Sequence, residues 1–225
     1  MYPLDYFGQL ELPLEPFQSA ATAVTWQALW ADRVVLVAAV FVLIICAKDI
    51  ALIFPYSLDA LLRFKVNRTI QHSWHLARSR VVACLGMTLP FCIVSERYAL
   101  VPFGWWSQIA ALAAYLVLRR CVGALLRSGR LSGEDWKSVL YSPLSSFVPL
   151  VALMMATAIA DAVFHFPEAG VRTALFVEMG IFFFAHIVHE GEFLRSAKSG
   201  LTTFLYLCAL ELVCAGAVVA AIHFI

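Results

Sequence analysis

Apolar runs separated by short polar connections extend over most of the chain. We interpret six of these runs as membrane-spanning helices, at 34–56, 81–95, 103–118, 139–164, 171–194 and 201–225. A helix needs about 20 residues to cross a hydrocarbon core of about 30 Å, and most of the runs come close to that length. The pattern therefore predicts an all-α fold, a polytopic transmembrane bundle of about six spans.

The segments between and before these runs complete the predicted organisation. Residues 1–33 mix apolar positions with prolines, and Trp26 and Trp30 suit the headgroup level of a bilayer. We expect an interfacial N-terminal segment over 1–33, followed by the six-span bundle over 34–225. The connection 57–80 is predicted to be an amphipathic surface segment, and 127–137 a hydrophilic loop.

The composition indicates a membrane protein and restricts its partners. Of the 225 residues, 62% are hydrophobic and 14% are charged, whereas soluble domains contain about 45–50% apolar and about 25% charged residues. The net charge of +1 argues against a nucleic-acid partner. The six cysteines include no Cys-x-x-Cys pair and are expected to pack as small buried residues. We expect the partners to be the lipid bilayer and other membrane proteins.

The basic residues gather in alternate connections. Twelve Lys and Arg residues lie in the first, third and fifth connections, and three lie on the opposite side. Because short connections rich in Lys and Arg stay in the cytoplasm, both termini are predicted to lie outside it.

The run 177–194 is apolar enough to enter a bilayer but contains five polar residues: Glu178, His186, His189, Glu190 and Glu192. At about 100° per residue, one helical stripe holds Glu178, Phe182, Ala185, His189 and Glu192, with His186 at its flank. A charged side chain at the bilayer centre costs on the order of 3 kcal/mol. The stripe is therefore predicted to face other helices or a wet cavity.

Within this run, His186, His189 and Glu190 have the His-x-x-His-Glu spacing. Residues three and four apart are neighbours on a helix, so a metal or haem site is one interpretation, and His72 and His75 could add ligands from the same side. The His-Glu-x-x-His order of zinc proteases is absent, and one helix supplies no complete ligand set. We therefore expect no metal and no cofactor, with the histidines bonded to carbonyl groups or acidic partners.

Glu211 is the most isolated acid in the sequence, ten residues into the last predicted span. A buried carboxylate either takes a proton or finds a cation or donor on another helix. The candidate partners are the polar stripe, including Glu178, and Lys48 of the first span. Lys48 also has Asp49 beside it, so a local pair near the interface is the simpler interpretation of that lysine.

The sequence Tyr-Leu-Cys-Ala-Leu-Glu at 206–211 resembles the Tyr-Leu-Cys-Thr-Leu-Glu signature of a six-helix inner-membrane protein family of Bacteroidota that carries a domain of unknown function. The Phe-Pro-Tyr-Ser stretch and the basic connection after it, within 53–68, are also similar. Here Ala209 replaces the Thr, and Val213-Cys214 stands where Leu-Pro is expected. The resemblance implies an inner-membrane location, and hence periplasmic termini, but no activity.

These observations favour a noncatalytic integral membrane protein, an accessory or scaffold subunit of a larger cell-envelope assembly. The alternative is a small proton-linked transporter or channel that uses intramembrane acids and histidines such as Glu178, His189 and Glu211. An inverted transporter repeat would require matching halves, and the two halves of this sequence do not align.

Overall fold

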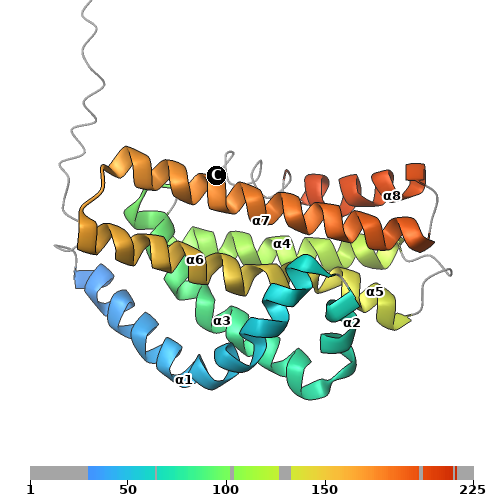
Figure 1. The fold of residues 1–225 in the computed structure, drawn as a ribbon, viewed down its shortest axis with the longest axis horizontal. Helices are drawn as coiled ribbons and strands as arrows, with labels where there is room; N and C mark the ends of the chain where they lie inside the picture. The colour runs from blue at the N-terminus through green and yellow to red at the C-terminus, as the bar shows by residue number, and fades with distance from the viewer. Residues whose placement is uncertain are drawn as a thin grey trace, which may run out of the picture. The chain divides into compact units, whose positions relative to one another are not determined.

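The computed structural model describes residues 30–63, 65–101, 104–126, 133–197, 200–214 and 216, and every element in them is helical. In chain order these are α1 (Trp30–Leu62), α2 (Lys65–His72), α3 (Trp74–Arg97), α4 (Trp105–Leu126), α5 (Gly133–Leu140), α6 (Ser142–Phe164), α7 (Glu168–Ala197), α8 (Gly200–Leu207) and the π-helix η2 (Cys208–Val213). The all-α prediction is confirmed for this part of the chain (Figure 1).

Five helical stretches among the described residues are long and apolar enough to cross a membrane: Arg33–Leu62, Trp74–Arg97, Trp105–Leu126, Asp135–Phe164 and Glu168–Arg195. They correspond to the first five predicted spans, as in a multi-pass membrane protein. The sixth predicted span, 201–225, is described only in part. The predicted interfacial segment lies outside the described residues, except that α1 already begins at Trp30.

The predicted boundaries that are wrong include the start of the second span at 81, the end of the third span at 118 and the end of the hydrophilic loop at 137. The second predicted span, 81–95, is part of a longer helix, α3, which begins at Trp74. The last residues of the connection 57–80 already form the first turns of this helix. Within this connection α2 is amphipathic, as predicted, because Ile70 is buried whereas Lys65 and Arg68 are exposed. In the predicted hydrophilic loop, α5 begins at Gly133, and its Trp136 is buried against α7 and η2. In α5, apolar contacts with other helices thus outweigh the local polarity of the sequence.

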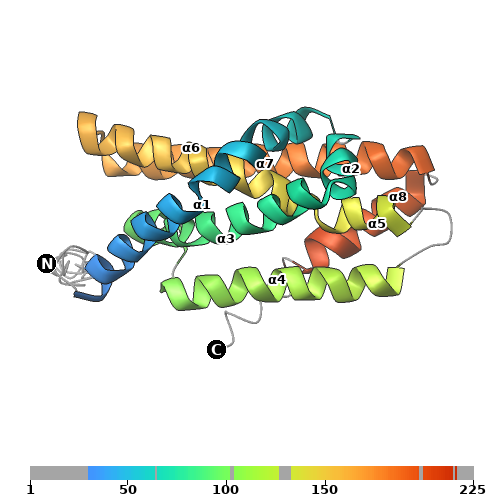
Figure 2. The ribbon, with the colours of Figure 1, turned by 90° about the horizontal axis from the view of Figure 1, so that it is seen from below.

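The main hydrophobic core lies between α3, α6 and α7, which pack in that order (Figures 1 and 2). A second, smaller cluster joins α5, α7 and η2 through Trp136, Val139, Leu194 and Leu210. Figure 2 shows α4 at one side of the bundle, where η2 contacts it. The second cluster therefore holds the ends of α4, α5 and α7 around η2.

Helix α1 contacts the bundle through a narrow seam. Ala39, Cys46, Ile53 and Ala60 are buried at intervals of seven residues, which is the heptad spacing of packed helices. The helix comes very close to α3, because a Cβ atom added at Gly86 would lie 2.9 Å from Cys46 Cβ. Small residues allow such close packing where lipid provides no hydrophobic force between helices.

Gly86→Ala is expected to destabilise the packing of α1 on α3. The added methyl group would also lie 3.0 Å from Cys46 Sγ, and overpacking of this kind costs about 1–3 kcal/mol. Thermal unfolding in detergent measures the effect, with Gly180→Ala as the control because a Cβ there meets nothing within 4 Å. Equal melting temperatures for the two variants would contradict the close contact, whereas adding Cys46→Gly to Gly86→Ala should restore stability.

Candidate functional site

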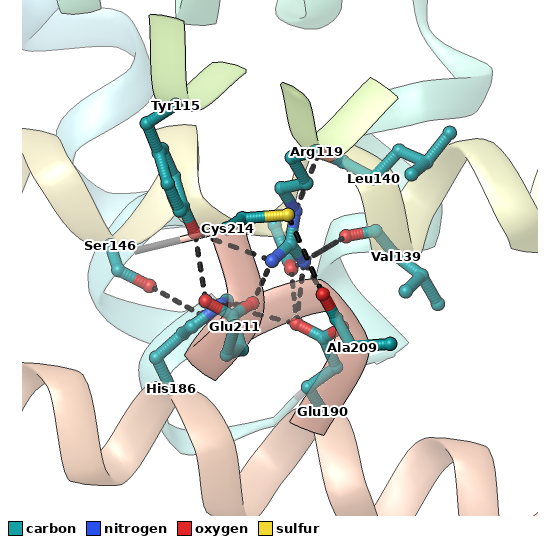
Figure 3. A network of polar contacts seen from close by, with 11 residues as sticks. Tyr115, Arg119, Val139, Leu140, Ser146, His186, Glu190, Ala209, Glu211 and Cys214 are labelled. Carbon is teal, nitrogen blue, oxygen red and sulfur yellow. Dashed lines mark hydrogen bonds and ion pairs between the residues drawn. The ribbon is translucent and has the colours of Figure 1, made fainter. Parts of the chain in front are cut away.

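Four ionisable side chains from α4, α7 and η2 meet inside the bundle (Figure 3). The exposed fractions are 0% for Arg119, 0% for Glu190, 1% for Glu211 and 8% for His186. Together with the hydroxyl groups that contact them, they form what we call the Arg119 network: Tyr115, Arg119, Ser142, Ser146, His186, Glu190 and Glu211. The network ties together segments up to 96 residues apart in the sequence.

Arg119 lies at the centre of the network. Its Nη2 donates to both carboxylate oxygens of Glu190, at 3.0 Å and 2.8 Å. It also donates to the carbonyl of Val139 at 3.0 Å, while Nε donates to the carbonyl of Leu140 at 3.3 Å. These carbonyls are at the end of α5, where the helix itself offers no donor. One guanidinium therefore binds an acid of α7 and caps the C-terminus of α5.

Glu211 binds the other side of the guanidinium. Its Oε1 forms an ion pair with Arg119 Nη1, and the Tyr115 hydroxyl donates to its Oε2 at 2.8 Å. Tyr115 also accepts a hydrogen bond from Arg119 Nη1 at 3.3 Å. Both oxygens of this carboxylate are thus paired within the protein.

His186 bridges the two carboxylates. Its Nε2 lies 3.1 Å from Glu190 Oε2 and 3.2 Å from Glu211 Oε1, and its Nδ1 lies 3.4 Å from Ser146 Oγ. His186 and Glu190 are four residues apart on α7, so they share one face of the helix. Ser142 Oγ, 3.0 Å from Glu190 Oε2, completes the surroundings of that acid.

The charges of the network do not balance without a proton. One guanidinium stands against two carboxylates, which leaves one negative charge if His186 is neutral. Because an uncompensated charge is costly away from water, a proton held by His186 or by a carboxylate would neutralise the network. The two carboxylates therefore exceed the single guanidinium by one negative charge.

Glu211 lies in a π-helix, η2. Such widened turns are rare and occur frequently at functional sites. The Cys214 thiol donates to the Ala209 carbonyl at 3.5 Å, across the turn that carries Glu211. The proline expected from the family resemblance is absent, yet the helix departs from α geometry at this place.

The predicted site residues separate into two groups. His186, Glu190 and Glu211 come together, whereas Glu178, His189 and Lys48 do not join them. Glu211 was predicted to pair with the polar stripe of the fifth span or with Lys48. Among these groups, His186 is the one that contacts it.

The other three candidates lie elsewhere in the bundle. Glu178 accepts a hydrogen bond from Thr157 of α6 at 2.5 Å, and its Oε2 has no partner. Lys48 is exposed on α1 and makes no ion pair within the described residues, and Asp49 accepts a hydrogen bond from Ser79 at 2.6 Å instead. The local pair predicted for Lys48 is therefore wrong.

The buried polar face of α7 is displaced from the predicted stripe. His186 and Glu190 are buried, whereas His189 is half-buried and the Glu192 side chain is 72% exposed. His189 Nδ1 lies 3.6 Å from Glu192 Oε2, and both residues line a groove of about 630 Å³ beside α2. A shift of one residue turns a helical face by about 100°, which explains the difference.

The sequence pattern missed Arg119, the central residue. The third predicted span ends at Leu118, but α4 continues to Leu126, so Arg119 lies within a helix that is long and apolar enough to cross a membrane. The apolar residues that follow it are the signal that could have identified this position.

A metal ion would have a partial ligand set in the network. Ligand atoms of His186, Glu190 and Glu211 lie within 4.8 Å of one another, and imidazole and carboxylate groups suit several divalent metals. Arg119 already pairs with both carboxylates, so a metal would have to displace a bound cation. His72 and His75 are both exposed and lie outside this group.

Comparison of the chain with protein-family models, characterised proteins and solved structures found no match. The resemblance at 206–211 therefore stays an expectation.

Proposed function

We propose that the chain is a noncatalytic subunit of a larger assembly in the bacterial inner membrane, and that the Arg119 network locks its helices into one arrangement. The observation that carries this proposal is the complete pairing of the charged atoms. Both oxygens of Glu190 and Glu211 and all three guanidinium nitrogens of Arg119 have partners inside the protein. A substrate site would instead keep some donor or acceptor free for its ligand.

The membrane setting explains why a scaffold would need such a lock. Lipid is as apolar as the helix surfaces, so burial alone gives little force for helix association, and packing and polar contacts take its place. The Arg119 network joins α4, α5, α6, α7 and η2 through contacts that depend on direction. A bundle held in this way presents a constant surface to other membrane proteins.

The proposal predicts partners at a constant ratio. We expect the tagged chain, extracted from its native membrane in mild detergent after cross-linking, to carry at least one other membrane protein in fixed stoichiometry. Arg119→Met should lose that protein because the lock is broken, whereas Arg78→Met, an exposed arginine on α3, should retain it. Recovery of the chain alone after cross-linking would contradict the subunit proposal.

A second function, a proton-linked transporter or channel, is favoured by one observation. The network has two carboxylates and one imidazole around a single guanidinium, which is one negative charge more than its cation balances, and a proton-linked function would use these groups to bind and release the proton. Glu178, two turns away along α7, has a buried oxygen without a partner and could serve as a further station. Proton flux into liposomes that contain the purified chain would support this function over the scaffold.

The predicted orientation of the bundle is tested separately from either function. Alkaline phosphatase fused after Ile225 is expected to be active, because this end is predicted to be periplasmic, and fusion after Gly133 is expected to be inactive. The reverse activities would contradict the proposed topology.

A further inference from the structure

A pocket of about 200 Å³ lies between α3, α4 and the first turns of α6. Its walls are largely apolar, with Val81 and Leu85 from α3, Leu112 and Leu116 from α4 and Phe147 from α6. Val81 is 41% exposed and Leu85 is 68% exposed, so the pocket opens outward where the helices would meet lipid. Its apolar lining suits part of a hydrocarbon chain.

One part of the pocket is basic. Arg120 and Tyr141 line it, and the guanidinium of Arg120 donates to the Tyr141 hydroxyl and lies 4.8 Å from the centre of its ring. The guanidinium of Arg80 lies 5.4 Å from the same ring. Two positive charges thus gather at one aromatic side chain.

These two charges have no acidic partner among the described residues. Arg80 is 1% exposed, donates to Gln71 at 2.8 Å and to Ser145 at 3.4 Å, and leaves its Nε without a partner. Among the described residues, Arg120 binds the Tyr141 hydroxyl and ring and no other group. Arg119, the neighbour of Arg120, is by contrast neutralised by two carboxylates. The basic part of the pocket therefore has an excess of positive charge that an anion would compensate.

We propose that this pocket binds an anionic phospholipid of the cytoplasmic leaflet. Arg120 and Tyr141 hold the phosphate, Arg80 adds positive charge from within the bundle, and part of one acyl chain fills the apolar pocket. The basic part lies at the end of the bundle predicted to face the cytoplasm, and basic pockets between membrane helices on that side bind anionic headgroups. The adjoining apolar walls specify a lipid, since a free phosphate would gain nothing from them.

Native mass spectrometry of the purified chain tests this site. The chain is incubated with equal amounts of dioleoyl phosphatidylglycerol and dioleoyl phosphatidylcholine, and the lipid that stays bound is measured. We expect phosphatidylglycerol to be retained in preference. Arg120→Gln should weaken the binding of phosphatidylglycerol about fivefold, the effect of one basic residue near an anionic surface. Arg195→Gln should not weaken it, although Arg195 is an exposed arginine of α7 at the end of the bundle that is also predicted to face the cytoplasm.

Two further arms separate a lipid from a simple anion. Leu116→Phe keeps every charge but narrows the pocket, so it should also reduce retention of phosphatidylglycerol. Inorganic phosphate added in excess should not displace the lipid. Equal retention of the two lipids, unchanged binding in Arg120→Gln, or displacement by inorganic phosphate would each overturn the proposal.

Discussion

Arg119→Met is expected to lower the free energy of unfolding by about 3–5 kcal/mol, the usual loss when one partner of a buried ion pair is removed. The substitution keeps a side chain of similar length but leaves Glu190 and Glu211 buried without their cation. It also removes the donors to the carbonyls of Val139 and Leu140 at the end of α5. Thermal unfolding in detergent measures the loss.

Two comparisons make the Arg119 result specific. Arg78→Met, on the exposed surface of α3, should change stability by less than about 0.5 kcal/mol, as surface substitutions usually do. The triple variant Arg119→Met, Glu190→Gln, Glu211→Gln should recover most of the stability, because no uncompensated charge remains. A triple variant as unstable as Arg119→Met would show that packing around Arg119, and not charge, holds the helices.

Glu211→Leu is expected to be far more damaging than Glu211→Gln. Leucine leaves Tyr115, Arg119 Nη1 and His186 without a shared partner, and each buried group left unpaired costs about 1–3 kcal/mol. Glutamine can still accept from Arg119 through its amide oxygen and can donate to the Tyr115 hydroxyl through its amide nitrogen, while Arg119 and Glu190 remain a balanced pair. Unfolding temperature and recovery of the folded chain from the membrane measure the difference.

The glutamine variant also separates the two proposed functions. If the Arg119 network is a lock, Glu211→Gln should keep its partner proteins, because the lock does not depend on binding and releasing a proton. If the network carries protons, the variant should assemble normally but lose proton flux in liposomes. Glu192→Gln, on the exposed side of α7, is the matched control. Normal stability in Glu211→Leu would exclude a special role for this acid.

The periodic pattern of the sequence determined the helices and the acids that need partners. Apolar runs of about 20 residues have few structures open to them in a bilayer, since only helices and closed barrels satisfy the backbone. Because hydrocarbon offers no hydrogen-bond partner to a carboxylate, Glu211 in an apolar run needs a partner inside the bundle. His186 and Glu190 were likewise identifiable from the sequence as polar groups on an apolar helix.

Only the tertiary structure decided which of these groups meet. The periodicity of α7 did not distinguish between two helical faces that are offset by one residue. It therefore placed His189, and not Glu190, on the face predicted to meet the other helices. Arg119 escaped detection because a basic residue near the end of an apolar run usually marks the membrane boundary, whereas α4 continues beyond it. Its partners Glu190 and Glu211 lie 71 and 92 residues away in the chain. Contacts of that range depend on how whole helices pack, and the local pattern of apolar and polar residues does not encode them.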